Sequence, residues 1–357
     1  MGGVALAALS LVWLVYEQLT GLSGGLGFFL CWFATFLIMY WIVQRQRHDK
    51  MAARDRLVTV MIGGLAAVIF AALAVIIGYV IFRGYSTLRL HFFTVDQRHV
   101  GPLSPATAGG GLAAIVGSLE QVGLALLISV PLGVGTAVFL SEVKGKLGRP
   151  VRIFVEAMNG IPSILAAIFI YQIWLIEAHN QVSGFAVAMA LSISMMPTVA
   201  RTCEVVLRLV PGGLREGSLA LGGLEWRMVR NVVLPTARTG IITAIVLGMA
   251  RVVGEAAPAL IDGGESNTVN WNPFHGPQDD LPYFVYRLVR EPIKAENLRA
   301  WTGAMVLVGI VLVLFIVARM FSGTWHPLGW GRGLIDRSRR SRSPLIETDA
   351  TSNGGSS

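Results

Sequence analysis

Two charged residues, Arg251 and Glu255, lie in a segment that is otherwise apolar enough to cross a membrane. A helix starting near Thr236 carries Arg251 about 22 Å along its axis, at a rise of 1.5 Å per residue. A charge at such depth costs on the order of 2.5–3.5 kcal/mol, so both side chains should face a bundle interior or a water-filled path. Their spacing of four residues places them on one helix face. They either form a mutual ion pair that locks helices together or line a water-filled path.

Arg201 and Glu204 form a second pair of the same kind, spaced by three residues and therefore also expected on one helix face. They lie closer to the end of their predicted helix, where a long side chain can extend to the membrane surface. From this position alone, the pair can be interpreted as an ion pair at the membrane interface.

The polar stretch between the helices that carry these pairs has a regular pattern of small residues. It reads Glu216-Gly-Ser-Leu-Ala-Leu-Gly222, then nine residues, then Val232-Val-Leu234-Pro235. Small side chains permit another surface to approach closely, and Gly222 allows the backbone to leave a helix in a left-handed conformation. We predict a short surface helix here.

Long apolar helices must position these residues. Of the 357 residues, 54% are hydrophobic and 14% are charged, against roughly 25% charged in an average soluble domain. Five uncharged runs reach 18 residues or more, and about 20 such residues cross a hydrocarbon core. The sequence predicts an all-α integral membrane protein with eight spans, at about 4–20, 24–43, 57–82, 112–140, 154–176, 183–200, 238–261 and 300–320.

Basic loops predict the orientation, because Lys and Arg concentrate on the cytoplasmic side. They gather in 44–56 and 141–152, between spans six and seven, and after span eight, which places both termini in the cytoplasm. If the first span does not cross, only the N-terminal end changes side. Two long outside loops, 83–111 and 262–299, are rich in turn residues, and the tail 334–357 is predicted to be disordered.

Several other functions are excluded or disfavoured. The net charge of +8 is explained by the basic loops, so no nucleic-acid partner is expected, and Cys31 and Cys203 have no disulfide or metal-site spacing. Gly21-Leu-Ser23-Gly24 resembles the serine motif of rhomboid proteases. However, a serine nucleophile needs a base, and every His and Lys lies outside the predicted membrane cores. The chain has no Gly-x4-Gly-Lys-Ser/Thr phosphate loop, so we expect no ATPase site and no cofactor of its own.

The pattern at 216–235 resembles the coupling motif of ATP-binding-cassette (ABC) import permeases: Glu-Ala-Ala, three residues, Gly, nine residues, Ile-x-Leu-Pro. Gly217 and Ser218 replace the two alanines. The four defining positions are occupied at the expected spacing by Glu216, Gly222, Leu234 and Pro235. Three further segments resemble the phosphate permeases of the PstA family specifically: Gly160-Ile-Pro162-Ser163-Ile, Pro197-Thr-Val-Ala-Arg201-Thr-Cys-Glu204 and Ala250-Arg251-Val-Val-Gly254-Glu255-Ala-Ala-Pro258.

This resemblance implies a six-helix type I permease core over 57–321, with extra helices in 1–50 and a coupling helix near 214–223. It implies a subunit of an ATP-driven inorganic phosphate importer in the bacterial inner membrane, forming half of the translocation path. The pathway residues it implies are Arg201, Glu204, Arg251 and Glu255, with Arg251 and Glu255 as a charge-balanced relay for the anion.

The partners implied by the resemblance are a similar second permease, two cytoplasmic ATPase subunits that bind the ATP, and an extracytoplasmic phosphate-binding protein. Membrane lipid surrounds the helices. Sulfate or molybdate as the transported anion stays open as an alternative, as does, more remotely, an intramembrane serine protease. A passive channel would need no coupling motif.

Overall fold

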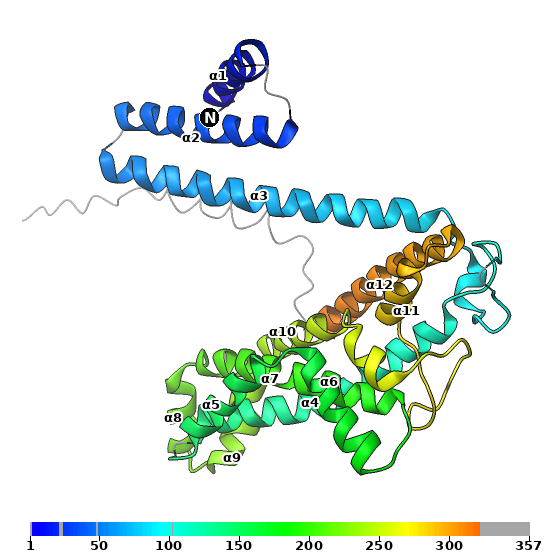
Figure 1. Cartoon of the computed structure of the whole chain (residues 1–357). Coiled ribbons are helices and arrows are strands. Elements are labelled where there is room, and N and C mark those ends of the chain that lie inside the picture. The colour runs from blue at the N-terminus through cyan, green and yellow to red at the C-terminus, as the bar shows by residue number, and fades with distance from the viewer. Residues whose placement is uncertain (1, 21–23, 48, 102, 144, 322–357) are drawn as a thin grey trace, which may run out of the picture. The chain divides into compact units, whose positions relative to one another are not determined.

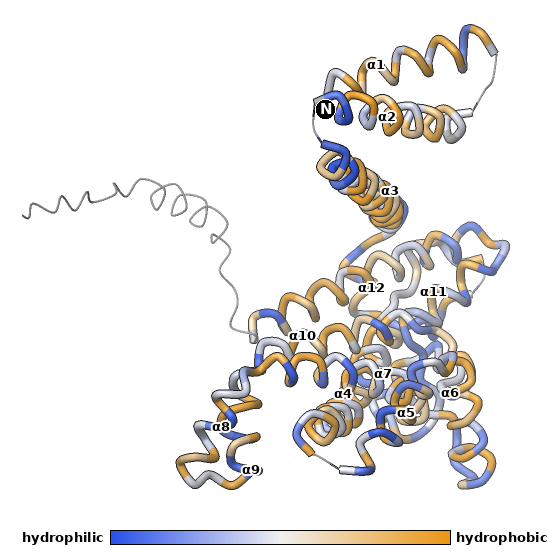
Figure 2. The backbone as a smooth tube through the Cα atoms, turned by 90° about the vertical axis from the view of Figure 1, so that its left-hand side faces the viewer, coloured by the Kyte–Doolittle hydropathy of each residue, from blue (hydrophilic) through white to orange (hydrophobic). Residues whose placement is uncertain are grey.

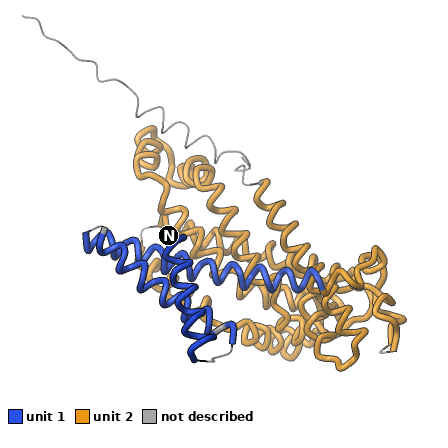
Figure 3. Tube along the Cα trace, turned by 90° about the horizontal axis from the view of Figure 1, so that it is seen from above, with its two compact units in different colours: residues 1–82 blue, residues 83–357 orange. Residues whose placement is uncertain are grey.

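The computed structural model describes residues 2–20, 24–47, 49–101, 103–143 and 145–321. Within these ranges the chain is built from helices and connecting turns, with one isolated bridge between Ser183 and Gly276 (Figure 1). The predicted disorder of the tail 334–357 lies outside the described residues. The chain divides into two compact units, 1–82 and 83–357 (Figure 3).

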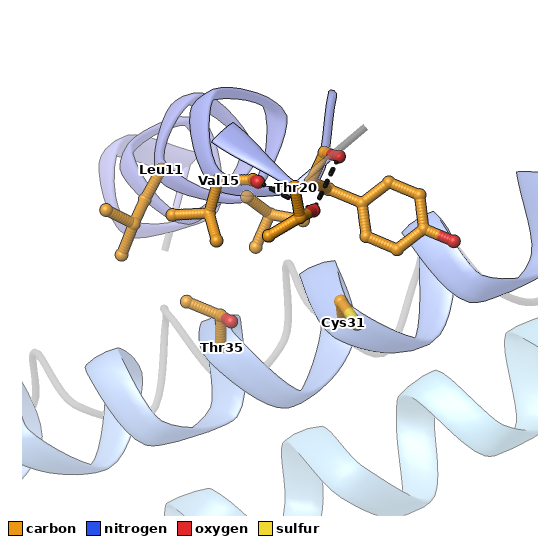
Figure 4. A pocket seen from close by; sticks show the side chains of 7 residues that line it. Leu11, Val15, Thr20, Cys31 and Thr35 are labelled. Carbon is orange, nitrogen blue, oxygen red and sulfur yellow. Dashed lines mark hydrogen bonds between the residues drawn. The ribbon is translucent and has the colours of Figure 1, made fainter. Parts of the chain in front are cut away.

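The first unit is a set of apolar helices. It comprises α1 (Gly2–Trp13), the π-helical turn η1 (Leu14–Leu19), α2 (Gly25–Arg47) and most of α3 (Lys50–Tyr85). Large apolar side chains are exposed around all three helices, as expected where lipid is the solvent. Figure 2 shows that hydrophobic residues predominate along them. Ala8, Phe36 and Tyr40 form a small core, and a groove of about 280 Å³ separates α1 and η1 from α2 beside Cys31 (Figure 4).

The second unit is a helical bundle arranged around one central helix, α7. Its elements are η2 (Leu90–Phe93), α4 (Leu112–Glu142), α5 (Gly148–Asn159), α6 (Ser163–Ile170), η3 (Tyr171–Glu177), α7 (Gly184–Arg208), α8 (Gly212–Ala220), α9 (Glu225–Met228), η4 (Val229–Val233), α10 (Leu234–Val252), η5 (Ala259–Gly263), α11 (Leu281–Arg290) and α12 (Lys294–Phe321). Helix α7 packs against α4, α10, α5 and α6, and its side chains are the most completely buried of any membrane-length helix (Figure 1).

Glycines allow the neighbours of α7 to approach it closely. A Cβ atom on Gly133 of α4 would lie 2.9 Å from the Val199 side chain, and one on Gly248 of α10 would lie 2.6 Å from it. Both distances are below ordinary van der Waals contact, so the helix backbones can lie this near only because these residues have no side chain. The result is a tight α4–α7–α10 core around Leu191 and Met195.

Seven described helices are long and apolar enough to cross a membrane, or up to eight if one bent helix pair is a single span. The prediction of an all-helical membrane protein with about eight spans is therefore confirmed. The fifth predicted span, 154–176, is not one straight helix. Helices α5 and α6–η3 are bent by 101° at the break. Pro162, in extended conformation, has no N–H for helical bonding and restricts Ile161 before it, so the helix ends near Gly160.

The seventh predicted span, 238–261, is also interrupted. Helix α10 ends at Val252 and is followed by a turn. The chain becomes helical again immediately before η5. Pro258 cannot donate the backbone hydrogen bond that would continue a helix through Gly254, which favours a break at this point. The expectation that Arg251 and Glu255 share the face of one continuous helix is therefore wrong.

The 262–299 segment is more ordered than its turn-rich sequence predicts, because it contains α11 and a deeply buried stretch before it. Gln278 is 1% exposed and donates to Oε2 of Glu120, a carboxylate on α4, at 2.6 Å. A Cβ atom on Gly117 of α4 would lie 1.9 Å from the Asp279 carbonyl oxygen. This stretch therefore fits between α4 and α7 only where α4 has a glycine.

Candidate functional site

Polar residues line the facing sides of α5 and α7. On α5 they are Arg152, Glu156 and Asn159, and on α7 they are Thr198, Arg201, Glu204 and Arg208. Spacings of three and four residues put each set on one helix face. We call these seven residues the polar seam.

Each α5 residue of the seam has a partner on α7. The Thr198 hydroxyl donates to Asn159 Oδ1 at 3.4 Å, Arg201 pairs with Glu156 at 3.0 Å, and Arg152 pairs with Glu204 at 2.8 Å. The contacts follow one another along the two helices at intervals of about one turn, or roughly 5 Å. The seam is thus a row of polar contacts through an otherwise apolar bundle.

Glu204 is the most buried member of the seam, at 3% exposure. Three guanidinium groups surround its carboxylate: Arg152 and Arg208 each donate to Oε1 at 2.8 Å, and Arg201 donates to Oε2 at 2.9 Å. The expected pairing of Arg201 with Glu204 on one helix face is present. A buried carboxylate needs such partners, because desolvation without them costs several kcal/mol.

Arg251 lies at one end of the seam, beside Asn159 of α5 and Thr198 of α7. Its Nη1 donates to Asn159 Oδ1 at 2.6 Å and to Thr198 Oγ1 at 3.0 Å, and its Nη2 donates to the Asn159 carbonyl at 3.4 Å. Among the described residues, Arg251 and Glu255 form no ion pair within 4.0 Å. The interpretation as a mutual helix-locking pair is therefore not supported by the geometry.

Glu255 lies in the turn after α10 and still reaches the same region. Ser163, at the start of α6, and Arg251 are the polar groups that act on its carboxyl group. Glu255 Oε2 is buried and has no hydrogen-bond partner. The break at Pro162 and the break after Val252 therefore bring one end of each interrupted span to the seam.

When Arg251 and Glu255 are added to the seam, its charged residues number seven, four arginines and three glutamates. Their net charge is +1. Sequence reasoning found four of these seven residues and missed Arg152, Glu156 and Arg208. It also missed the uncharged Asn159 and Thr198. The spacing of Arg152, Glu156 and Asn159 was the available signal, but Arg152 was assigned to the loop 141–152 and the other two residues to the span 154–176.

The segment with the small-residue pattern forms α8, a turn, and the start of a second helix that continues into α10. Gly222 has a φ of +79°, the left-handed conformation predicted for it, and Leu234 and Pro235 begin α10. Glu216 is exposed on α8. Several apolar side chains are exposed nearby, namely Leu219, Leu221, Leu224 and Trp226.

Arg215 fastens α8 to the bundle, a role not predicted from the sequence. Its guanidinium forms a bidentate pair with Glu142, at 2.9 and 3.1 Å, at the end of α4. It also donates to the carbonyls of Leu207 and Val210, at 2.8 and 2.7 Å, where α7 ends. One guanidinium therefore joins α8 to the ends of α4 and α7.

A bundle of membrane-length helices with a charged seam inside it and an exposed surface helix at one end defines a polytopic membrane permease. Residues 129–326 match the family of binding-protein-dependent transport system inner membrane components, and the chain belongs to this family.

Named relatives extend the similarity beyond this core. The chain is 41% identical over 243 residues to the phosphate transport system permease protein PstA 1 of Mycobacterium tuberculosis (strain CDC 1551 / Oshkosh), covering 68% of this chain and 79% of that protein. It is 31% identical over 289 residues to PstA of Haemophilus influenzae, covering 80% of this chain and 96% of that protein.

A solved bacterial ABC transporter involved in the import of the acidic polysaccharide alginate has the same fold. One of its chains aligns with a TM-score of 0.53 at 17% identity, covering 78% of this chain and 98% of that chain. At this identity the likeness extends to the arrangement of the helices alone.

Proposed function

We propose that this protein is the transmembrane permease subunit of an ATP-driven inorganic phosphate importer. The observation that carries the proposal is the polar seam with Arg251 at its end, in a chain whose relatives are named phosphate permeases at up to 41% identity. Guanidinium groups bind oxyanions through charge-assisted hydrogen bonds, and a single net positive charge attracts an anion without holding it irreversibly.

Arg251 and Asn159 are exposed although they lie at membrane depth in this proposal. An exposed arginine facing lipid would be costly, so the exposed side needs a polar or protein neighbour. A second permease of similar fold meets that need, with each subunit contributing half of the path. Arg201, Glu204, Arg251 and Glu255 are the pathway residues of this half.

Glu255 supports phosphate over sulfate as the transported anion. An ionised carboxylate only accepts hydrogen bonds, and Glu255 Oε2 has no donor. Phosphate at neutral pH carries a proton that it can donate to this oxygen, whereas sulfate carries none and is repelled. Sulfate and molybdate remain the alternative substrates.

Helix α8 is the proposed coupling helix. Its exposed leucines, with Trp226 and Glu216, suit a desolvated groove on a cytoplasmic ATPase, and Arg215 transmits the movement of that subunit to α4 and α7. Two such ATPase subunits bind the ATP, and this chain has neither catalytic site nor cofactor. A phosphate-binding protein delivers the anion from the other side. Both termini are cytoplasmic, the helices of 1–50 are an addition to the core, and no nucleic acid is bound.

Uptake of labelled phosphate and sulfate by vesicles containing the complete transporter tests this proposal. Arg251→Gln is expected to abolish uptake of both anions, because a charge-assisted hydrogen bond worth about 1.5–3 kcal/mol is lost at the centre of the path. Glu255→Gln is expected to weaken phosphate uptake and to relax the rejection of sulfate. Lys294→Gln, an exposed cation at the start of α12, is the matched control and should behave as wild type.

The selectivity of the binding protein is measured separately, so that a change in sulfate uptake reports on the permease. Unchanged phosphate uptake by Arg251→Gln contradicts the pathway assignment.

A further inference from the structure

Arg152, Arg201 and Arg208 gather around the carboxylate of Glu204 in a group that we call the Glu204 cluster. It lies at the end of α7 that leads into α8, whereas Arg251 is held by Thr198. Six residues of helix separate Thr198 from Glu204, the centre of the cluster, or about 9 Å. The two groups of arginines are therefore separate places along the seam.

The cluster carries three positive charges against the single negative charge of Glu204. Each of the three guanidiniums gives one hydrogen bond to this carboxylate, where a single arginine often gives two. A guanidinium has five N–H donors, so most of the donors are not engaged with Glu204. Arg208 is 52% exposed and Arg201 is 39% exposed, so these donors face outward, and the buried Nε of Arg152 has no partner.

Glu156 occupies part of this donor surface. It pairs with Arg201 Nη2 at 3.0 Å, while Arg201 Nη1 stays on Glu204. Glu156 is 51% exposed, and exposed ion pairs contribute little net stability. Its carboxylate is therefore a replaceable partner, in contrast to the buried carboxylate of Glu204.

We propose that the Glu204 cluster is a second oxyanion site, at which inorganic phosphate displaces Glu156 from Arg201 and also binds Arg208. This inference rests on the proposed function, since it supplies the next binding position for an anion that leaves Arg251. Glu156 then takes back Arg201 when the anion departs, so that the anion is released without an unpaired arginine remaining in the seam.

The ligand chemistry is that of phosphate oxygens, which free phosphate and a phosphomonoester lipid headgroup share. Val205 offers a local probe, because it is 60% exposed and lies on α7 four residues after Arg201 and three before Arg208. A cysteine at this position, in a chain with Cys31→Ala and Cys203→Ala, reports on this cluster and not on sites in a second permease.

The experiment measures the rate at which a neutral maleimide labels Val205→Cys in the complete transporter, held in zwitterionic lipid nanodiscs without the binding protein. Inorganic phosphate is compared with chloride at constant ionic strength. Phosphate is expected to slow labelling. Glu156→Gln should lower the half-effective phosphate concentration about 2–5-fold, because the competing ion pair is gone. Arg208→Gln should raise it about tenfold or more.

Arg149→Gln is the matched control, since Arg149 is exposed on α5 and belongs to no contact of the cluster; it should change nothing. Absence of protection by phosphate, or equal protection in Glu156→Gln and Arg208→Gln, would overturn the proposal. A second set of measurements uses nanodiscs that contain phosphatidic acid. If this lipid slows labelling and inorganic phosphate has no further effect, the cluster binds a lipid headgroup, and the proposal of a phosphate site is also overturned.

The Arg251→Gln background separates this proposal from the preceding one. The local protection should persist there while uptake is lost. If Arg251→Gln shows normal uptake, only the assignment of Arg251 to the pathway is contradicted. If phosphate does not protect Val205→Cys while Arg251→Gln still abolishes uptake, only the second site is contradicted.

Discussion

The left-handed turn at Gly222 gives a sharp test of the proposed coupling helix. Gly222 has a φ of +79°, and nothing lies within 4 Å of a Cβ atom built on it. A substitution to alanine therefore meets no neighbour, and its only intrinsic cost comes from the backbone. This separates the conformation of the turn from its packing.

The magnitude follows from the cost of the left-handed conformation for an L-residue with a side chain, about 1–2 kcal/mol. A change of that size alters the ratio of two conformations by about 5–30-fold. Asparagine tolerates this region better than alanine does. Glutamate adds a charge that must be desolvated in a binding groove. Coupling is expected to be strongest with the native Gly222 and to weaken in the order Gly222→Asn, Gly222→Ala, Gly222→Glu.

The assay is the number of phosphate ions imported per ATP hydrolysed by the reconstituted transporter, with the amount of permease in the membrane measured in parallel. All three variants should reach the membrane at normal levels. Gly222→Ala should lower the ratio several-fold, and Gly222→Glu should abolish transport. Gly213→Ala in α8 is the matched control, because Gly213 is equally open but has no positive φ, and its replacement should be neutral or slightly stabilising.

Equal transport by Gly222→Ala, Gly222→Glu and Gly213→Ala would refute the docking of this turn on an ATPase. Reduced amounts of Gly222→Ala in the membrane, with a normal ratio of transport to hydrolysis, would show instead that the turn serves the fold alone.

Two further predictions concern orientation and pH. In a chain without native cysteines, a cysteine at Lys146 should resist an impermeant thiol reagent in intact cells, and one at Trp271, which is 69% exposed, should label; the reverse result inverts the topology. Burial raises the pKa of Asp279 from 3.8 to about 7, against the opposing charge of Arg287. Because the folded state holds this proton more tightly, stability should fall as pH rises from about 4 to about 7, and Asp279→Asn should flatten this dependence of the melting temperature of the purified transporter.

The membrane-length helices could be predicted from the sequence because lipid imposes a simple requirement. Every backbone polar group must be satisfied internally, so long apolar runs become helices whatever their neighbours are. The runs in 57–82, 112–140 and 300–320 lie within α3, α4 and α12. The same rule does not reveal where a span is interrupted, because an interruption is tolerated wherever protein covers it.

The breaks at Pro162 and after Val252 illustrate that limit. Prolines are common in membrane helices and often produce only a kink, so Pro162 alone does not distinguish a kink from the observed 101° bend. Pro131 lies inside α4, and that helix continues through it. The outcome depends on whether nearby groups can satisfy the freed backbone, which is a property of the packed bundle.

Side chains that pair between distant segments were the least predictable part of the site. Arg201 and Glu204 could be linked by their spacing, since both lie on α7. Nothing local links Asn159 to Arg251, 92 residues away, or Arg215 to Glu142, 73 residues away. Such pairs depend on which helix faces meet.

The two interruptions also change what the charged residues can do. In a continuous helix, Arg251 and Glu255 would lie one turn apart, and a mutual ion pair would occupy the donors of one and the acceptors of the other. With α10 ending at Val252, Arg251 is held by Asn159 and Thr198 instead, and Glu255 keeps a buried oxygen without a donor. A separated cation and acceptor can both contact one protonated oxyanion, which a closed pair cannot. The breaks that sequence reasoning missed are therefore the features that make these two residues suited to binding an anion.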